Sequence, residues 1–131
     1  MFKFVTEADA REQLRLDSDA DERWLALWIP AVSSSVAAWL KQEWRLYVLQ
    51  RDSSGDVVRD GSGVPLPVLD GDDQPILQPA VIAATLLELA SQYRYREGEG
   101  ENLVPADAGH GYVLSKAATA QLAPLRRTTV A

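Results

Sequence analysis

Three aspartates near the amino-terminal end have the spacing of a calcium-binding loop. Asp17, Asp19 and Asp21 reproduce the alternating carboxylates that open an EF-hand loop. Glu22 then stands where that loop needs glycine, and Trp28 stands where it needs the bidentate glutamate. We therefore interpret the aspartates as helix caps within a solvated acidic turn, and we predict no metal site.

The single histidine, His110, is the other residue that could take part in proton transfer. A catalytic histidine needs a nucleophile and an orienting group. The sequence identifies neither, so we interpret His110 as a loop residue. The glycines at 61–63 and 98–100 lack the spacing and the lysine of a phosphate-binding loop. These patterns predict a protein that is not an enzyme, needs no cofactor and acts through binding or as a structural component.

The composition is that of an ordinary globular domain. The 131 residues include 47% hydrophobic and 24% charged residues, and they contain no cysteine, which excludes disulfides and thiolate metal sites. No stretch reaches the roughly eighteen apolar residues of a membrane span, and the first residues lack the apolar segment of a signal peptide. The net charge of −6 is opposite to that of proteins that hold DNA by its phosphates. An acidic surface would suit a channel through which DNA must slide.

Caps and apolar spacing predict four helices. The first spans residues 6–15, with Thr6 as N-cap and Asp9 completing a capping box. The second begins at about residue 20 and runs past Lys41, at most as far as Val48, and residues 44–50 would also suit a strand. Pro30 predicts a kink or break near residues 26–30 of this helix. The third spans 79–97, and the last runs from 113 or 115 to 122. We predict an all-α fold, a small helical bundle forming a single domain over residues 1–131, without internal repeats.

Two segments outside these helices differ in composition. Residues 52–78 are rich in aspartate, glycine, serine and proline, and we predict a long loop or a two-stranded hairpin there, between the second and third helices. Residues 123–131 follow the last predicted helix and are expected to form a carboxy-terminal tail.

The tryptophans are numerous for a chain of this length. All four lie on or near the second predicted helix: Trp24, Trp28, Trp39 and Trp44. A large aromatic core would explain them, but their spacing does not place them on one helix face. Because tryptophan is enriched at interfaces, we predict a subunit interface that includes Trp24, Trp44, Arg94 and Arg96. An RNA-stacking role for residues 93–96 would need more basic surroundings.

The order of these features resembles the head–tail connector family of tailed bacteriophages, also called adaptor or head-completion proteins. The resemblance covers roughly two-thirds of the chain, and it depends on the whole ordered set and not on any single motif. The set comprises Val5-Thr6, Ala10, residues 14–17, residues 25–40, residues 79–89, Tyr93, Arg96-Glu97, Val104-Pro105 and residues 122–126.

The resemblance implies a structural virion protein at the head–tail interface, assembled in the cytoplasm of the bacterial host. It implies a homo-oligomeric ring, a dodecamer in the virion, that docks on the portal protein, extends the DNA channel and receives a tail or stopper protein. It also implies no enzymatic activity, cofactor, membrane or sequence-specific DNA contact. The carboxy-terminal segment would reach the portal, which makes Leu122, Pro124, Leu125, Arg126 and Arg127 candidate portal contacts. The loop at 52–78 would face the lumen, the next ring component or a neighbouring subunit.

The alternative hypothesis is a small helical regulator that binds a protein or a nucleic acid. Such a protein would display a basic recognition helix. The sequence contains no helix of that kind.

Overall fold

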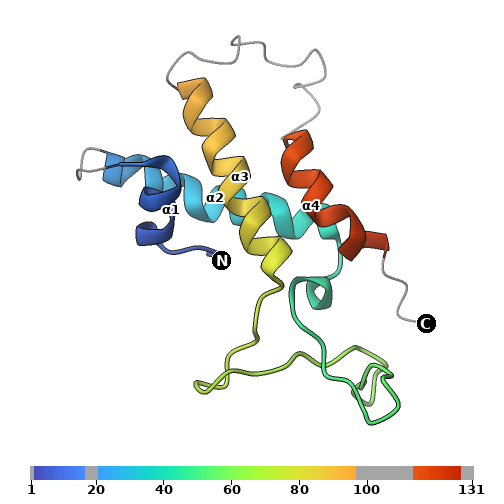
Figure 1. Ribbon diagram of the computed structural model, residues 1–131. Helices are drawn as coiled ribbons and strands as arrows, with labels where there is room; N and C mark the ends of the chain where they lie inside the picture. The colour runs from blue at the N-terminus through green and yellow to red at the C-terminus, as the bar shows by residue number, and fades with distance from the viewer. Residues whose placement is uncertain (1, 17–20, 97–113, 128–131) are drawn as a thin grey trace.

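The computed structural model describes residues 2–16, 21–96 and 114–127. Within them it contains four α-helices and one 3-10 helix: α1 (Glu7–Leu14), α2 (Glu22–Leu40), η2 (Glu43–Leu46), α3 (Pro79–Arg96) and α4 (Lys116–Arg127). Helix α3 crosses α2 and packs against α1 and α4, which lie on its two sides (Figure 1). The predicted all-α bundle is thus confirmed. Residues 17–20, residues 97–113, which include His110 and its predicted loop, and residues 128–131 lie outside the described part of the chain.

The start of the chain is fixed by local caps and one long-range hydrogen bond. The predicted capping box forms: the Asp9 amide donates to Thr6 Oγ1 at 3.0 Å, and the Thr6 amide donates to Asp9 Oδ2 at 3.5 Å. Arg15 ends α1 with φ of 58°. Before the helix, the Phe4 amide donates to the fully buried Ser33 Oγ on α2 at 3.0 Å. This bond satisfies a buried hydroxyl and attaches the amino-terminal segment to the bundle.

Helix α2 differs from its prediction at two points. It is continuous through Pro30, so of the kink or break predicted near residues 26–30 the break does not occur. Pro30 leaves the Ala26 carbonyl without its helical donor, but Ala26 lies on the exposed side, where water can take the donor's place. The helix ends at Leu40 and not near residue 48, because Lys41 adopts a positive φ of 71° and the chain then enters η2.

The core collects apolar side chains from all the helices. Those that are buried include Ala10, Leu25, Ile29, Val32, Val36, Leu40, Leu46, Val81, Ala84, Leu89, Ala118 and Leu122. Burial of a leucine side chain stabilises a fold by about 1.5–3 kcal/mol, so this set supplies most of the favourable free energy of the bundle.

Helix α4 begins at a buried carboxylate and continues beyond its predicted end. Glu88 of α3 is fully buried, and its Oε1 accepts the Ser115 amide at 2.7 Å. Its Oε2 accepts from Gln92 Nε2 at 2.9 Å. Ser115 Oγ in turn accepts the Ala118 amide at 3.2 Å, as an N-cap does. The predicted end at residue 122 is wrong, since α4 continues through Pro124 to Arg127.

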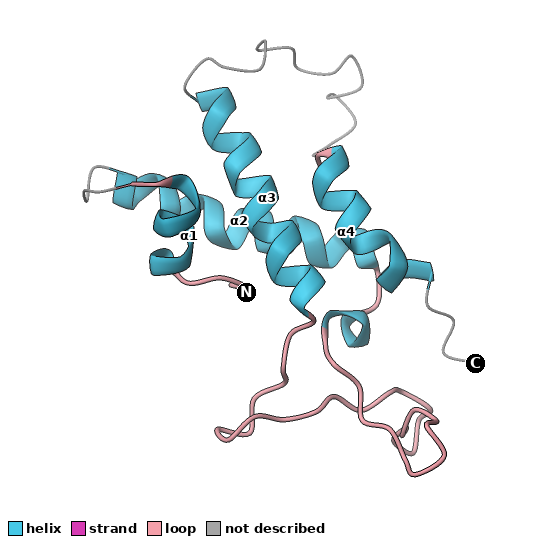
Figure 2. Cartoon of the chain, in the orientation of Figure 1, coloured by secondary structure: helices cyan, strands magenta, loops and turns pink. Residues whose placement is uncertain are grey.

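Residues 47–78 form an arm that projects from the bundle between η2 and α3 (Figure 2). No strand is assigned in the described residues, but the arm contains three hairpin turns where one was predicted. Each turn opens on an aspartate whose Oδ1 accepts two backbone N–H groups, from the second and fourth residues after it: Asp52, Asp60 and Asp70. The third residue after each aspartate has a positive φ: Gly55 (85°), Gly63 (83°) and Asp73 (60°). This is a type I turn closed by a left-handed residue.

The three hairpins are joined by two closed rings of backbone hydrogen bonds. In the first ring Val48 donates to Ile76, Ile76 donates to Val68, and Val68 donates to Val48, at 2.8–3.0 Å. In the second ring Gln50, Leu66 and Val58 donate to one another in the same cyclic way. The arm is thus a branched set of short strand pairs with an internal repeat, and the prediction of no internal repeat is wrong.

Proline occupies three bridge positions of the arm. Pro65, Pro67 and Pro75 take no part in the two rings. Because proline has no N–H, it cannot donate a backbone hydrogen bond at these positions. Pro65 is buried, and Pro67 and Pro75 are half-buried.

We expect Glu88→Ala to destabilise the bundle by about 2–4 kcal/mol, because it leaves a cavity and two donors without their acceptor. Urea unfolding followed by far-UV circular dichroism measures the loss. Glu88→Gln keeps one oxygen acceptor and most of the side-chain volume, so it should lower the free energy of unfolding by less than Glu88→Ala does. Equal midpoints for the wild-type chain and Glu88→Ala would contradict the role given to this carboxylate.

The arm provides a matched pair of glycines for a second prediction. Neither Gly63 nor Gly61 has an atom within 4 Å of an added Cβ, and only Gly63 has a positive φ. We expect Gly63→Ala to cost about 1 kcal/mol of local stability through backbone strain, and Gly61→Ala to cost little. Hydrogen exchange of the Val58 and Leu66 amides measures the local stability of the arm in each variant. Equal protection in the two variants would show that the turn is not built as described.

Candidate assembly surfaces

The carboxy-terminal end of α4 carries the residues predicted to contact a portal. The Arg126 guanidinium lies 4.7 Å from the centre of the Trp39 ring, which attaches the end of α4 to the last turns of α2. Pro124 is exposed, and Leu125 is half-buried against the core. Leu122 is fully buried and therefore contributes no side chain to this surface. The Arg127 side chain lies outside what the structure describes.

The residues predicted to form a subunit interface lie on three elements: Trp24 on α2, Trp44 in η2, and Arg94 and Arg96 on α3. Near the start of α2, the Trp24 ring stacks on the Trp28 ring, with 5.7 Å between the ring centroids. The Trp24 and Tyr93 rings form a T-shaped pair, with 5.2 Å between their centroids. The Tyr93 hydroxyl donates to Asp21 Oδ2 at 3.0 Å. Trp24 is half-buried by these contacts, so aromatic packing within the chain accounts for much of its surface.

The remaining interface residues are dispersed. Trp44 lies in η2 beyond the end of α2, half-buried, with the Arg45 guanidinium 5.3 Å from its ring. Arg94 is exposed on α3, and the Arg96 side chain is not among the described ones. At a rise of 1.5 Å per residue, α2 extends roughly 24 Å from Trp24 to its last residue, Leu40, and Trp44 follows that end. The structure therefore does not bring these four residues together on one surface.

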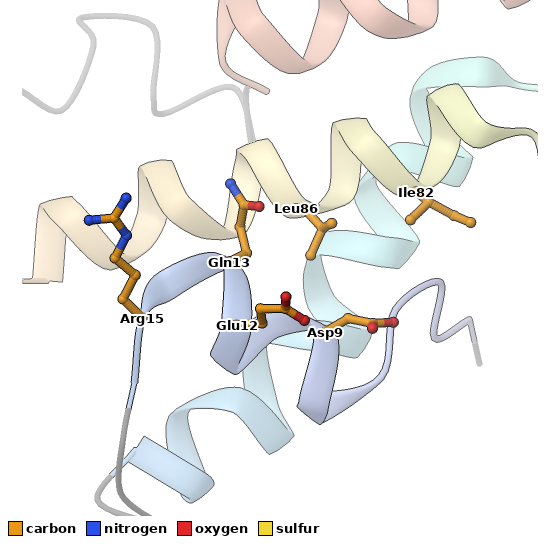
Figure 3. A pocket seen from close by; sticks show the side chains of 6 residues that line it. All are labelled: Asp9, Glu12, Gln13, Arg15, Ile82 and Leu86. Carbon is orange, nitrogen blue, oxygen red and sulfur yellow. The ribbon is translucent and has the colours of Figure 1, made fainter.

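A shallow groove of about 530 Å³ lies between α1 and α3 (Figure 3). Asp9, Glu12, Gln13 and Arg15 line it from the side of α1, and Ile82 and Leu86 line it from α3. Such a groove offers carboxylates and one guanidinium above two aliphatic side chains, which suits a protein contact better than a reaction. No group of three metal-ligating side chains occurs among the described residues.

The arm is attached to the bundle by Tyr47 and Leu77, which form an antiparallel bridge and pack against the core. Gln78 Nε2 donates to the Tyr47 carbonyl at 3.1 Å. Burial raises the pKa of the Tyr47 phenol, and the negative charge of Glu43 raises it further. The Tyr47 hydroxyl therefore stays protonated to a higher pH than an exposed tyrosine does.

Comparisons of the chain with family models, with characterised proteins and with solved structures found no match. Among the described residues, no helix is both long and apolar enough to cross a membrane.

Two features of these surfaces were not predicted from the sequence: the exposed face of α2 and the exposed apolar residues of the arm. Leu27 on α2 and Val64, Leu69 and Ile76 on the arm are the large hydrophobic side chains that remain exposed in the described part of the chain. A signal for the arm is present in the sequence. An aspartate recurs at 52, 60 and 70, each followed three residues later by glycine or aspartate.

Proposed function

We propose that this chain is a structural subunit of a phage head–tail connector, which docks on the portal as a ring. The observation that carries the proposal is the ordered residue pattern and its distribution over the structure. Of that pattern, Val5-Thr6, Ala10 and residues 14–16, 25–40 and 79–89 with Tyr93 fall on α1, α2 and α3 and on the segments that begin and end them. The variable segment between the second and third helices forms the projecting arm.

The surfaces of the chain support an assembly role. A small bundle with a projecting arm, exposed apolar side chains on both and a groove between α1 and α3 offers several places for other subunits to bind. In this proposal the ring places copies side by side, the portal receives the end of α4, and a tail or stopper protein binds the far side.

The charge of the chain supports passage of DNA without capture. The arm contains six aspartates and two arginines, so any part of it that faces the channel repels phosphate more than it attracts it. A ring of such subunits would line a channel that releases DNA.

Arg126→Glu tests the portal contact. We expect this variant to lose binding to the portal protein of the same virion by about tenfold or more, because one charge is reversed at the surface proposed to dock. Pull-down of co-expressed portal followed by electron microscopy of the particles measures it. Lys116→Glu makes the same charge change on an exposed residue at the other end of α4 and should leave binding intact.

Two outcomes would contradict the proposal. In one, the wild-type chain fails to bind portal at any concentration. In the other, it binds duplex DNA at micromolar concentration with a steep salt dependence, which would favour the regulator hypothesis.

A further inference from the structure

The three turns of the arm, which open on Asp52, Asp60 and Asp70, have the same backbone but not the same side chains. In each turn the aspartate amide donates across the turn to the residue four positions later, at 2.8–2.9 Å. The residue before each aspartate forms a bridge with the residue six positions after itself. Because these contacts recur, the turns correspond residue by residue, and the third turn differs from the other two in three respects.

An arginine braces each of the first two turns. Arg51 Nη1 donates to the Gly55 carbonyl at 2.9 Å, and Arg59 Nη1 donates to the Gly63 carbonyl at 2.8 Å. Leu69 occupies the corresponding position in the third turn, and its side chain has no hydrogen-bond donor. A hydrogen bond from a charged donor stabilises the closed turn. The third turn is without this contribution.

The residue with a positive φ is the second difference. It is a glycine in the first two turns, at Gly55 and Gly63, and it is Asp73 in the third, with φ of 60°. Glycine adopts this region without steric cost, whereas a residue with a Cβ is strained there. Aspartate tolerates the region better than most residues do, but it is still less suited to it than glycine. Asp73 therefore makes the third turn less stable than its counterparts.

Charge is the third difference. The third turn contains Asp70, Asp72 and Asp73, and the sequence has no lysine or arginine between Arg59 and Arg94. In each of the other turns an arginine directly precedes the first aspartate. Like charges within one turn repel each other, by an amount that salt reduces because the turn is exposed. All three differences thus favour opening of the third turn.

The hydrogen bonds of the arm allow the third turn to open alone. Opening of residues 69–75 breaks the bond donated by the Asp70 amide, but the second ring lies outside this segment, and Val68 keeps its bond to the Val48 carbonyl. We infer that residues 69–75 are the adjustable part of the arm, which opens and recloses while the first two turns stay closed. Segments of low local stability are the ones that change shape on binding. This turn therefore gives the arm a means of fitting its shape to a bound partner.

Hydrogen exchange of the three aspartate amides in the full-length chain measures the opening of each turn separately. Dividing the intrinsic exchange rate of each amide by its observed rate gives a protection factor. We expect the Asp70 amide to be protected about tenfold less than the Asp52 and Asp60 amides, because its turn lacks the arginine and contains the strained residue. Equal or greater protection at Asp70 would overturn the inference.

Variants that exchange side chains between turns test the cause. Leu69→Arg with Asp73→Gly gives the third turn the pattern of the other two, and we expect protection of its aspartate amide to rise about tenfold. Arg51→Leu with Gly55→Asp gives the first turn the pattern of the third, and protection there should fall by a similar factor. An added Cβ at Gly55 meets no atom within 4 Å, so the new side chain has room. A pair that leaves its turn unchanged, or changes it in the opposite direction, would overturn the proposed cause.

The Leu89 amide in α3 serves as the internal control. Leu89 is fully buried in the bundle, whereas the exchanged residues are exposed on the arm. We expect protection at Leu89 to be the same in the natural chain and in both double variants. A change at Leu89 that parallels the change in the turn would show that arm and bundle open together, which would overturn separate opening of the third turn.

Discussion

The packing of α3 against α1, α2 and α4 is the contact on which the rest of the bundle depends. Ala84, fully buried on α3, is small enough for a neighbouring helix to approach closely. One turn further along the same helix, Glu88 holds the Ser115 amide at the start of α4. A single helix thus contacts the other three helices and positions the first turn of the last one. The other end of α4 is then placed so that Arg126 lies over Trp39.

The arm is stabilised in a different way from the bundle. Its turns are closed by aspartate carboxylates and by residues with positive φ, and its branches are joined by rings of backbone hydrogen bonds. Little apolar surface is buried along most of its length, where many residues are exposed. The conformation of such a segment depends on its own hydrogen bonds and not on packing in the hydrophobic core, so its side chains can contact other molecules. Changes at its tips should therefore have little effect on the stability of the helices.

Local signals in the sequence predicted α1 and α3 well. The capping box at Thr6 and Asp9 and the proline at 79 fix helix starts through interactions within a few residues. The ends of α2 and α4 could not be predicted in this way. Lys41 leaves the helix with a positive φ that its residue type does not favour, and α4 extends past Pro124 into contacts with Trp39 and the core that come from distant parts of the chain.

The arm and the candidate surfaces were partly predictable. The repeated aspartates indicate turns, but the rings join residues as far apart as Val48 and Ile76, and no local pattern encodes such a join. Leu122 and Leu125 share the apolar spacing of a core face, so the sequence alone did not separate the buried Leu122 from the partly exposed Leu125. The portal, ring and virion assignments remain predictions.

The most direct test of the central claim is electron cryomicroscopy of the full chain bound to the portal of its virion. We predict a closed ring beneath the portal, with the end of α4 toward the portal. A virion neck that lacks this chain would contradict the connector assignment.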